Sequence, residues 1–260
     1  MKNVVILTTL LALACPFSAD ARRLKGDRSL SDTRYGYAVV SEPVRAGRKS
    51  QRFEVRAGDC GENPGWSDCK NDRERSEYAL RDRWRYGQER WIGFSVYVPQ
   101  DFRTSSIVNT TVGQIHQKGG PTGKAQGLPS FPPVVQLEMR GNDYTARIHL
   151  LSGSASNVRN TTRDIRLSKL DSMRGRWTDV LLHLDTRNGN ELLEIYLNGR
   201  RKAIVQDFIN FVPEQYYFKY GIYRSFVSKH GGPMPTQVLY IDEVRMGRKA
   251  TDATVNENRP

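Results

Sequence analysis

Alternation of apolar and polar side chains is the feature of this sequence that most restricts its fold. Helical patterning is scarce, whereas a period of two, typical of strands with one buried face, recurs along the chain. The clearest such segments are Trp91–Pro99, Val134–Arg140, Tyr144–Leu151, Trp177–Asp185, Glu191–Leu197 and Gln237–Met246. Asn-Gly pairs at 188–189 and 198–199 are typical of hairpin turns, because both residues tolerate positive φ. Many short strands between turns predict an all-β protein, a two-sheet antiparallel sandwich or jelly roll.

The start of the chain has the pattern of an export signal. An apolar run, Val4–Ala14, follows a basic residue and precedes an A-x-A site at Ala19–Ala21. This order is typical of a secretory signal peptide. The apolar run is too short to cross a membrane as a mature helix. We therefore predict a secreted or periplasmic protein, cleaved after Ala21 or after Ala19; lipidation of Cys15 is the alternative.

The spacing of two cysteines and the length of the chain predict a disulfide and a single domain. Cys60 and Cys69 enclose a segment rich in glycine and proline, and in an exported protein such a pair predicts a disulfide. Two thiols without a nearby histidine do not complete a zinc site. The signal occupies residues 1–21, and the remainder shows neither a linker nor a repeat. We expect one domain over residues 22–250 and a polar, frayed tail over residues 251–260.

The formal net charge of +12 limits the partners. An exported protein rarely meets nucleic acid as its proper partner, whereas the cell envelope offers acidic polysaccharide, which long-range attraction would also favour. Positive charge that only keeps the protein soluble is the alternative. We expect an acidic polysaccharide as partner, no nucleic acid, and a monomer.

Amide, cationic and aromatic groups share strand faces in separate segments. In Gln215–Ser225, alternation places Tyr217, Lys219, Gly221 and Tyr223 on one face. By the same rule Arg75 shares a strand face with Glu77, and Gln114 shares one with His116. Arg147 likewise shares a face with His149, and Arg140 shares one with Gln136 and Glu138. A long polymer can lie on the concave face of a sandwich, and we expect these groups to line it.

Such groups suit the cleavage of a 4-linked uronic acid without water. The proton at C5 lies next to a carboxyl group, whose charge amide, guanidinium or imidazolium donors must neutralise before the proton can leave. A base takes that proton and an acid protonates the departing 4-oxygen. A phenol can serve as either, if nearby cations help it to ionise. The reaction needs no metal.

Three segments resemble a known family. The sequences RSEYAL at 75–80, QIH at 114–116 and YFKYGIY at 217–223 look like the signature segments of the jelly-roll alginate lyases. From about residue 73 to 247 the chain is also similar to the heparin lyase I-like and glucuronan lyase group. The resemblance implies a concanavalin-like jelly roll and an endo-acting lyase that cleaves alginate, glucuronan or a related exopolysaccharide by β-elimination. It implies no cofactor, and a structural calcium is compatible with it.

The resemblance also implies catalytic roles. Gln114 would neutralise the substrate carboxyl group, and His116 would assist it or act as base. Tyr223 would be the catalytic tyrosine. We expect Lys219, on the same face, to favour the ionised form of Tyr223, and Gly221 to leave room for a sugar ring.

Further residues are expected to bind substrate. The resemblance implies that Arg75 binds the substrate carboxylate. Alternatively, Arg75 forms an ion pair with Glu77 or Glu74. The expected substrate-binding set is Arg75, Lys219, Glu77, Arg140, Arg147 and Tyr217. Lys118 and Lys124, with the glycines between them, are a candidate loop over the groove. Three departures from the alginate lyase motifs, Tyr78, Tyr220 and Arg224–Ser225, leave the catalytic positions intact and make the sugar preference uncertain.

Two other classes of protein fit part of the pattern. A jelly-roll glycoside hydrolase needs two carboxylates at a set separation, but the E-x-D-x-x-E strand signature is absent. Glu191 and Glu194 are three residues apart and cannot share a strand face. A lectin-like binding protein would explain the fold, the charge and the export, but not the collected tyrosine, histidine and glutamine.

Overall fold

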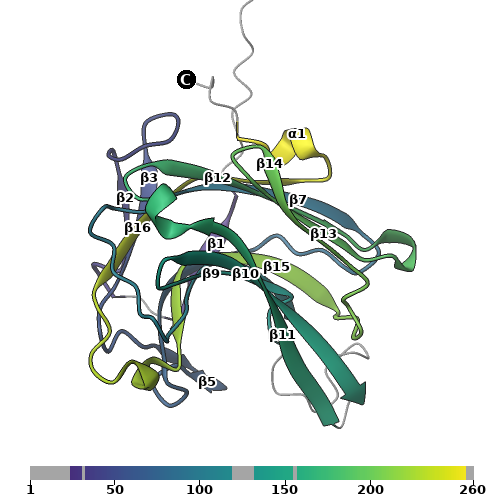
Figure 1. The fold of residues 1–260 in the computed structure, drawn as a ribbon, viewed down its shortest axis with the longest axis horizontal. Coiled ribbons are helices and arrows are strands. Elements are labelled where there is room, and N and C mark those ends of the chain that lie inside the picture. Colours follow the sequence, from purple (N-terminus) through teal and green to yellow (C-terminus); the bar gives the residue numbers. More distant parts are fainter. Residues whose placement is uncertain (1–23, 31–32, 119–131, 155–156, 256–260) are drawn as a thin grey trace, which may run out of the picture.

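The computed structural model describes residues 24–30, 33–118, 132–154 and 157–255. The predicted signal peptide, residue Lys124 of the predicted loop, and residues 256–260 of the predicted tail lie outside these ranges. Two antiparallel seven-stranded sheets form stacked layers (Figure 1). This arrangement confirms the predicted all-β jelly-roll sandwich. In the described residues no helix is both long and apolar enough to span a membrane.

The first layer, here called the front sheet, has the strand order β1-β6-β15-β8-β9-β10-β11. Its strands are β1 (Gly26–Ser29), β6 (Arg73–Leu80), β15 (Gln215–Ser225), β8 (Thr110–Lys118), β9 (Val135–Arg140), β10 (Asp143–Ser154) and β11 (Asn157–Lys169). The long β10–β11 hairpin extends away from the second layer in Figure 1. The three signature segments lie on β6, β15 and β8, which are neighbours in this sheet although they are far apart in the sequence.

The second layer, here called the back sheet, has the order β14-β13-β12-β7-β16-β3-β2. Its strands are β14 (Arg200–Gln206), β13 (Leu192–Leu197), β12 (Trp177–Asp185), β7 (Glu89–Tyr97), β16 (Gln237–Gly247), β3 (Ser50–Val55) and β2 (Tyr37–Val40). Short elements complete the fold: β4 (Glu62–Asn63), β5 (Trp66–Ser67), α1 (Ala250–Ala253) and three 3-10 turns, Leu170–Ser172, Arg187–Gly189 and Val227–His230.

The core lies between the two sheets, and alternation decides which side chains enter it. On β15, Tyr216, Phe218, Tyr220 and Ile222 are buried. The ring of Phe218 lies 5.5 Å from that of Phe94 on β7. This burial of one face leaves the alternate residues of β15 on the outer surface of the front sheet, as the sequence predicts.

The predicted tail needs a correction. Its first residues are not frayed, because α1 packs against β7 and β16 and buries Ala253. The helix lies so close that a Cβ at Gly93 would be 1.8 Å from the carbonyl oxygen of Ala253. Gly93 therefore provides the place where the chain end docks on the back sheet.

Candidate active site

A cleft of about 650 Å³ lies on the outer face of the front sheet. Residues from eight segments line it: Ser29, Leu30, Asn63, Trp66, Arg73, Arg75, Gln114, His116, Pro132, Pro133, Gln136, His149, Leu151, Val158, Asn160, Tyr217, Lys219, Tyr223, Ser225 and Phe226. The predicted residues Arg75, Gln114, His116, Tyr217, Lys219 and Tyr223 are all in this lining. The cleft thus brings together all three signature segments.

Strand register explains why these side chains meet. On β15, Tyr217 lies opposite His116 and Lys219 opposite Gln114, both on β8. On its other side, Tyr223 lies opposite Arg75 on β6. The Arg75 guanidinium carbon is 4.5 Å from the centre of the Tyr223 ring, so a cation covers the face of this phenol.

A buried carboxylate beneath the cleft holds three of the polar groups. Glu77 is 1% exposed. It accepts a hydrogen bond from Gln114 Nε2 at 2.5 Å and contacts Lys219 Nζ at 2.6 Å and Arg75 Nη1 at 3.1 Å. Buried cations need such partners, because an unpaired charge loses its hydration without compensation.

These contacts correct the predicted role of Glu77. Among the described residues, Glu77 is not part of the cleft lining, and its carboxylate is occupied by protein donors. It therefore positions Gln114, Lys219 and Arg75 rather than contacting a sugar. Arg75 pairs with Glu77, one of the two predicted alternatives, whereas Glu74 faces the other side of β6 and pairs with Arg224 at 2.5 Å.

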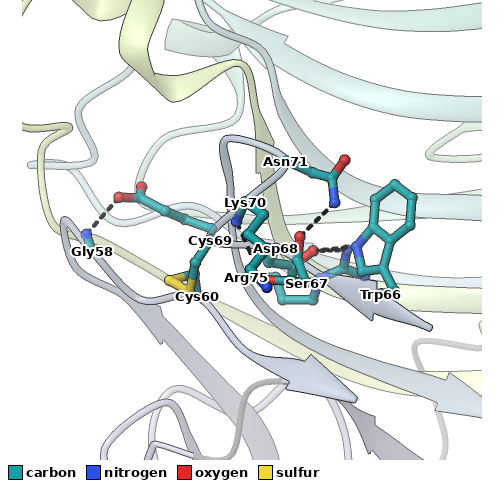
Figure 2. The surroundings of a disulfide bond; sticks show 10 residues. Gly58, Cys60, Trp66, Ser67, Asp68, Cys69, Lys70, Asn71 and Arg75 are labelled. Atoms are coloured by element: carbon teal, nitrogen blue, oxygen red, sulfur yellow. Dashed lines mark hydrogen bonds and ion pairs between the residues drawn. A yellow bond between two sulfur atoms is a disulfide. The ribbon is translucent and has the colours of Figure 1, made fainter. Parts of the chain in front are cut away.

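Asp68, which the sequence analysis did not single out, is the second partner of Arg75. Its carboxylate is fully buried and forms a two-pronged ion pair with the guanidinium, through Nη2 at 2.6 Å and through Nε. Asp68 comes directly before Cys69, and the predicted Cys60–Cys69 disulfide is present, with the two Cα atoms 5.1 Å apart. Figure 2 shows Asp68 between the disulfide and Trp66.

The expected effect of Lys219 on Tyr223 is wrong. The Lys219 ammonium turns to Glu77 on the neighbouring strand, and the cation next to the phenol is Arg75. Burial raises the pKa of Tyr223, and the nearby Arg75 opposes this only in part. The phenol is therefore protonated at neutral pH and is suited to donate a proton.

His116 has the opposite character. Burial, reinforced by the charge of Lys219, lowers the pKa of His116 to about 3, so its imidazole is neutral at neutral pH. Nδ1 lies 2.9 Å from the carbonyl oxygen of Gln117. A carbonyl accepts hydrogen bonds only, so Nδ1 carries the proton and Nε2 is left as a base. The ring stacks on Tyr217 with centroids 5.0 Å apart.

The far part of the cleft is formed by β9, β10 and β11. His149 Nε2 lies 2.8 Å from Gln136 Oε1, and His149 Nδ1 lies 3.1 Å from Asn160 Nδ2. Burial lowers the pKa of His149 to about 4. This second neutral histidine is thus held by two amide side chains that also line the cleft.

Two predicted substrate-binding arginines lie elsewhere. Within the described part of the chain, neither Arg140 nor Arg147 belongs to the cleft lining. Arg147 is engaged with Asp164 at 2.8 Å and with Glu138 at 3.3 Å. Arg140 is exposed at the end of β9. The alternation rule placed both on the correct face, but it does not show how far along the strand the cleft extends.

Gly221 also has a different role from the predicted one. Its φ is +126°, where side chains are disfavoured. A Cβ there would lie 2.4 Å from the carbonyl oxygen of Ser76 and 2.8 Å from Phe53 of the back sheet. The glycine is needed for the irregular pairing of β15 in this region and not for space around a sugar.

Neither Glu191 nor Glu194, the two glutamates considered for a hydrolase, is on the front sheet. Glu194 binds His183 Nδ1 at 2.9 Å on the back sheet, and Glu191 accepts a hydrogen bond from Tyr86. A group of possible metal ligands, Glu89, His183 and Asp185, is also on the back sheet. Arg187 Nη2 already contacts Glu89 at 3.0 Å and Asp185 at 2.7 Å, so a guanidinium fills the place of a cation there.

Comparisons with known proteins agree with this geometry. A sequence model of a polysaccharide lyase family matches residues 21–245. No curated protein matches the sequence. A solved endo-β-1,4-glucuronan lyase from the fungus Trichoderma reesei has a TM-score of 0.63 at 16% identity, over 86% of this chain and 90% of that chain.

Two alginate lyases are also similar in structure. A family 7 alginate lyase, A1-II′, solved in complex with product, has a TM-score of 0.56 at 14% identity, over 84% of this chain and 85% of that chain. The alginate lyase AlyC3 has a TM-score of 0.52 at 15% identity, over 76% and 75%. At such identities these structures show a shared fold.

Proposed function

The chain belongs to the polysaccharide lyase family, and from this premise we propose that it cleaves a 4-linked uronic-acid polysaccharide by β-elimination. One observation supports this most: a neutral imidazole, His116, and a protonated phenol, Tyr223, line the same cleft as the amide of Gln114. A base, an acid and a carboxylate-binding donor are the three groups that the elimination needs.

The proposed reaction begins at the substrate carboxylate. One N–H of the Gln114 amide donates to Glu77, and the second is available for a carboxylate in the cleft. His116 Nε2 takes the proton from C5, and the negative charge that develops spreads onto the neutralised carboxyl group. Hydrogen-bond donors that are already in place stabilise this charge without reorganisation.

Tyr223 completes the elimination. Its hydroxyl proton passes to the 4-oxygen as the bond between C4 and that oxygen breaks, and a double bond forms between C4 and C5. The products are a new reducing end and an unsaturated uronate end. Arg75, whose guanidinium covers the ring at 4.5 Å, stabilises the tyrosinate until solvent returns the proton.

The substrate and the location are also part of the proposal. Alginate, glucuronan or a related exopolysaccharide would each provide the carboxylate that this chemistry uses, and a net charge of +12 favours such a polymer. The predicted signal peptide and the disulfide are compatible with a secreted or periplasmic enzyme. The endo mode of cleavage follows the sequence resemblance and the structural similarity to an endo-acting glucuronan lyase.

A panel of acidic polysaccharides tests the proposal. We expect purified protein to release oligosaccharides with unsaturated uronate ends from at least one polyuronate, seen as ultraviolet absorbance and, by mass spectrometry, as products without added water. A neutral glucan is the control and should stay intact. Products that contain added water, or an intact polymer with every polyuronate tested, would contradict the proposal.

A further inference from the structure

An aromatic side chain on the disulfide hairpin lines the cleft without a part in the elimination. Trp66 lies on the β4–β5 hairpin, whose base the Cys60–Cys69 disulfide closes. Its indole Nε1 donates to Asp68 Oδ1 at 2.9 Å, which fixes the orientation of the ring (Figure 2). Asp68 is also the partner of Arg75. The buried carboxylate of Asp68 therefore fixes the orientation of both the Arg75 guanidinium and the half-buried Trp66 ring.

A second aromatic side chain, Phe226, lines the same cleft and is held in a strained backbone. Phe226 directly follows β15 and is 49% exposed. Its φ is +59°, which is rare for a bulky residue and persists only where the surrounding structure imposes it; such residues cluster at active sites and ligand-binding segments. Its N–H donates to the carbonyl oxygen of Asp72 at 2.8 Å, and the Arg73 guanidinium covers the ring at 3.8 Å.

Both rings are on the side of the cleft where the proposed acid lies. Tyr223 and Phe226 are three residues apart at the end of β15, and Arg73 lies opposite Ser225 on β6. His116, by contrast, lies opposite Tyr217, six residues along β15 from Tyr223. A ring with equatorial substituents offers an apolar C–H face, which stacks on aromatic side chains and is dehydrated on binding.

We propose that Trp66 and Phe226 form a sugar-binding subsite on the leaving-oxygen side of the cleaved bond. The ligand is a uronate pyranose, bound through its C–H face, with Arg73 beside Phe226 for its carboxylate. This assignment rests on the proposed lyase function. It gives the disulfide hairpin a role in the geometry of the active site, since the hairpin presents Trp66.

Substitutions that remove each ring test the subsite. Phe226→Asn removes the ring and keeps a residue that tolerates positive φ; Trp66→Ala removes the indole. On the best polyuronate found, we expect each to raise KM about tenfold, as for the loss of one good aromatic contact. The value of kcat should change little, because binding that is equal in ground and transition states affects KM alone.

Three controls separate the possible outcomes. Trp177→Ala, on the exposed face of the back sheet, should leave KM and kcat unchanged, and Phe226→Tyr, which keeps a ring, should retain most of the affinity. Calorimetric binding of the polymer to Tyr223→Phe, with and without Trp66→Ala, gives an answer that does not depend on turnover. Wild-type KM and wild-type polymer affinity in both ring-deleting variants would overturn the subsite. Absence of cleavage together with weaker binding of Trp66→Ala would instead overturn the lyase proposal and keep the subsite.

Discussion

The two faces that the sandwich turns to solvent carry similar residues in opposite arrangements. On the front sheet, His116 stacks on Tyr217, and the nearby charges that act on it are those of Lys219 and Arg75. On the back sheet, His183 stacks on Trp91 with centroids 3.8 Å apart, and its two nitrogens each lie 2.9 Å from a carboxylate, Glu89 and Glu194.

The difference lies in where the carboxylates are. On the front sheet, Glu77 is buried and pairs with Lys219 and Arg75, so it holds these two cations in place. In the described part of the chain, no carboxylate pairs with His116, whose Nδ1 lies next to the carbonyl oxygen of Gln117. On the back sheet the carboxylates lie beside the imidazole and occupy both of its nitrogens. A histidine on a strand face is therefore a better candidate base when one of its nitrogens is left without a carboxylate partner.

The largest expected effect comes from removing one phenol oxygen atom on the front sheet, compared with removing one on the back sheet. Tyr223→Phe should lower kcat by about 10²–10⁴-fold, because it removes the proton donor. The ring still packs under Arg75, so the fold and the polymer affinity should be retained. Tyr196→Phe on the back sheet is the matched control and should keep wild-type turnover. Rates of formation of unsaturated product measure both, and wild-type turnover by Tyr223→Phe would place the acid elsewhere.

The next largest effect is expected when His116 on the front sheet and His183 on the back sheet are each replaced by alanine. His116→Ala should lower kcat by about 10²-fold or more through loss of the base. His183→Ala should leave kcat unchanged and lower the free energy of unfolding by about 1–3 kcal/mol, because Glu89 and Glu194 lose a shared partner. Turnover and urea unfolding of both variants make the comparison. A similar loss of turnover in both variants would contradict the assignment of His116 as the base and His183 as a structural residue.

The fold was largely predictable because alternation reports burial directly. Strands such as β7 and β12, with one face in the core, were found from the sequence. β11 was not, since nearly all of its residues are exposed or half-buried and it has no apolar period. α1 was missed for a different reason: with four residues it is too short to show a helical period, and its contact with Gly93 is tertiary.

The site was predictable as far as local motifs extend. Three segments gave Gln114, His116 and Tyr223, and strand pairing brought them together. The partners of these groups depend on contacts between distant segments, so the sequence did not reveal Asp68 or the burial of Glu77. Trp66 had one indirect signal, its place inside the disulfide loop. Phe226 had none, because backbone strain leaves no mark in composition.

A third test compares the buried carboxylates of the two faces. Glu77→Gln leaves Lys219 without its carboxylate partner in a buried place, and we expect a loss of about 3–5 kcal/mol in the free energy of unfolding. Glu194→Gln on the back sheet should cost about 1 kcal/mol or less, since the amide oxygen of glutamine can still accept a hydrogen bond from His183 and the arginine partner, Arg201, is largely exposed. Urea unfolding at neutral pH measures both. Equal losses of unfolding free energy in the two variants would mean that Glu77 is not a buried partner of Lys219 and Arg75.

The smallest effect concerns Glu138, a buried carboxyl group of the front sheet on the strand next to Gln114. Burial raises its pKa to about 7, and the nearby Arg147 opposes this only in part. A pKa raised above the unfolded value means that the folded state binds the proton more tightly. The stability from this group is complete below pH 4.5 and is lost as the pH rises through 7.

Glu138→Gln should therefore make the protein relatively more stable in alkali. The rise from 4.5 to about 7 corresponds to about 3 kcal/mol, and the difference between pH 5 and pH 9 is smaller because the carboxyl group of the unfolded chain is already largely ionised at pH 5. We expect about 1–2 kcal/mol more stability relative to wild type at pH 9 than at pH 5, read from urea unfolding at the two pH values. If the difference between variant and wild type is the same at both, Glu138 is ionised in the folded protein over this whole range. The front sheet would then hold a second carboxylate charge below the surface, close to Thr111 and Arg147, and the contrast with the back sheet would rest on the position of Glu77 alone.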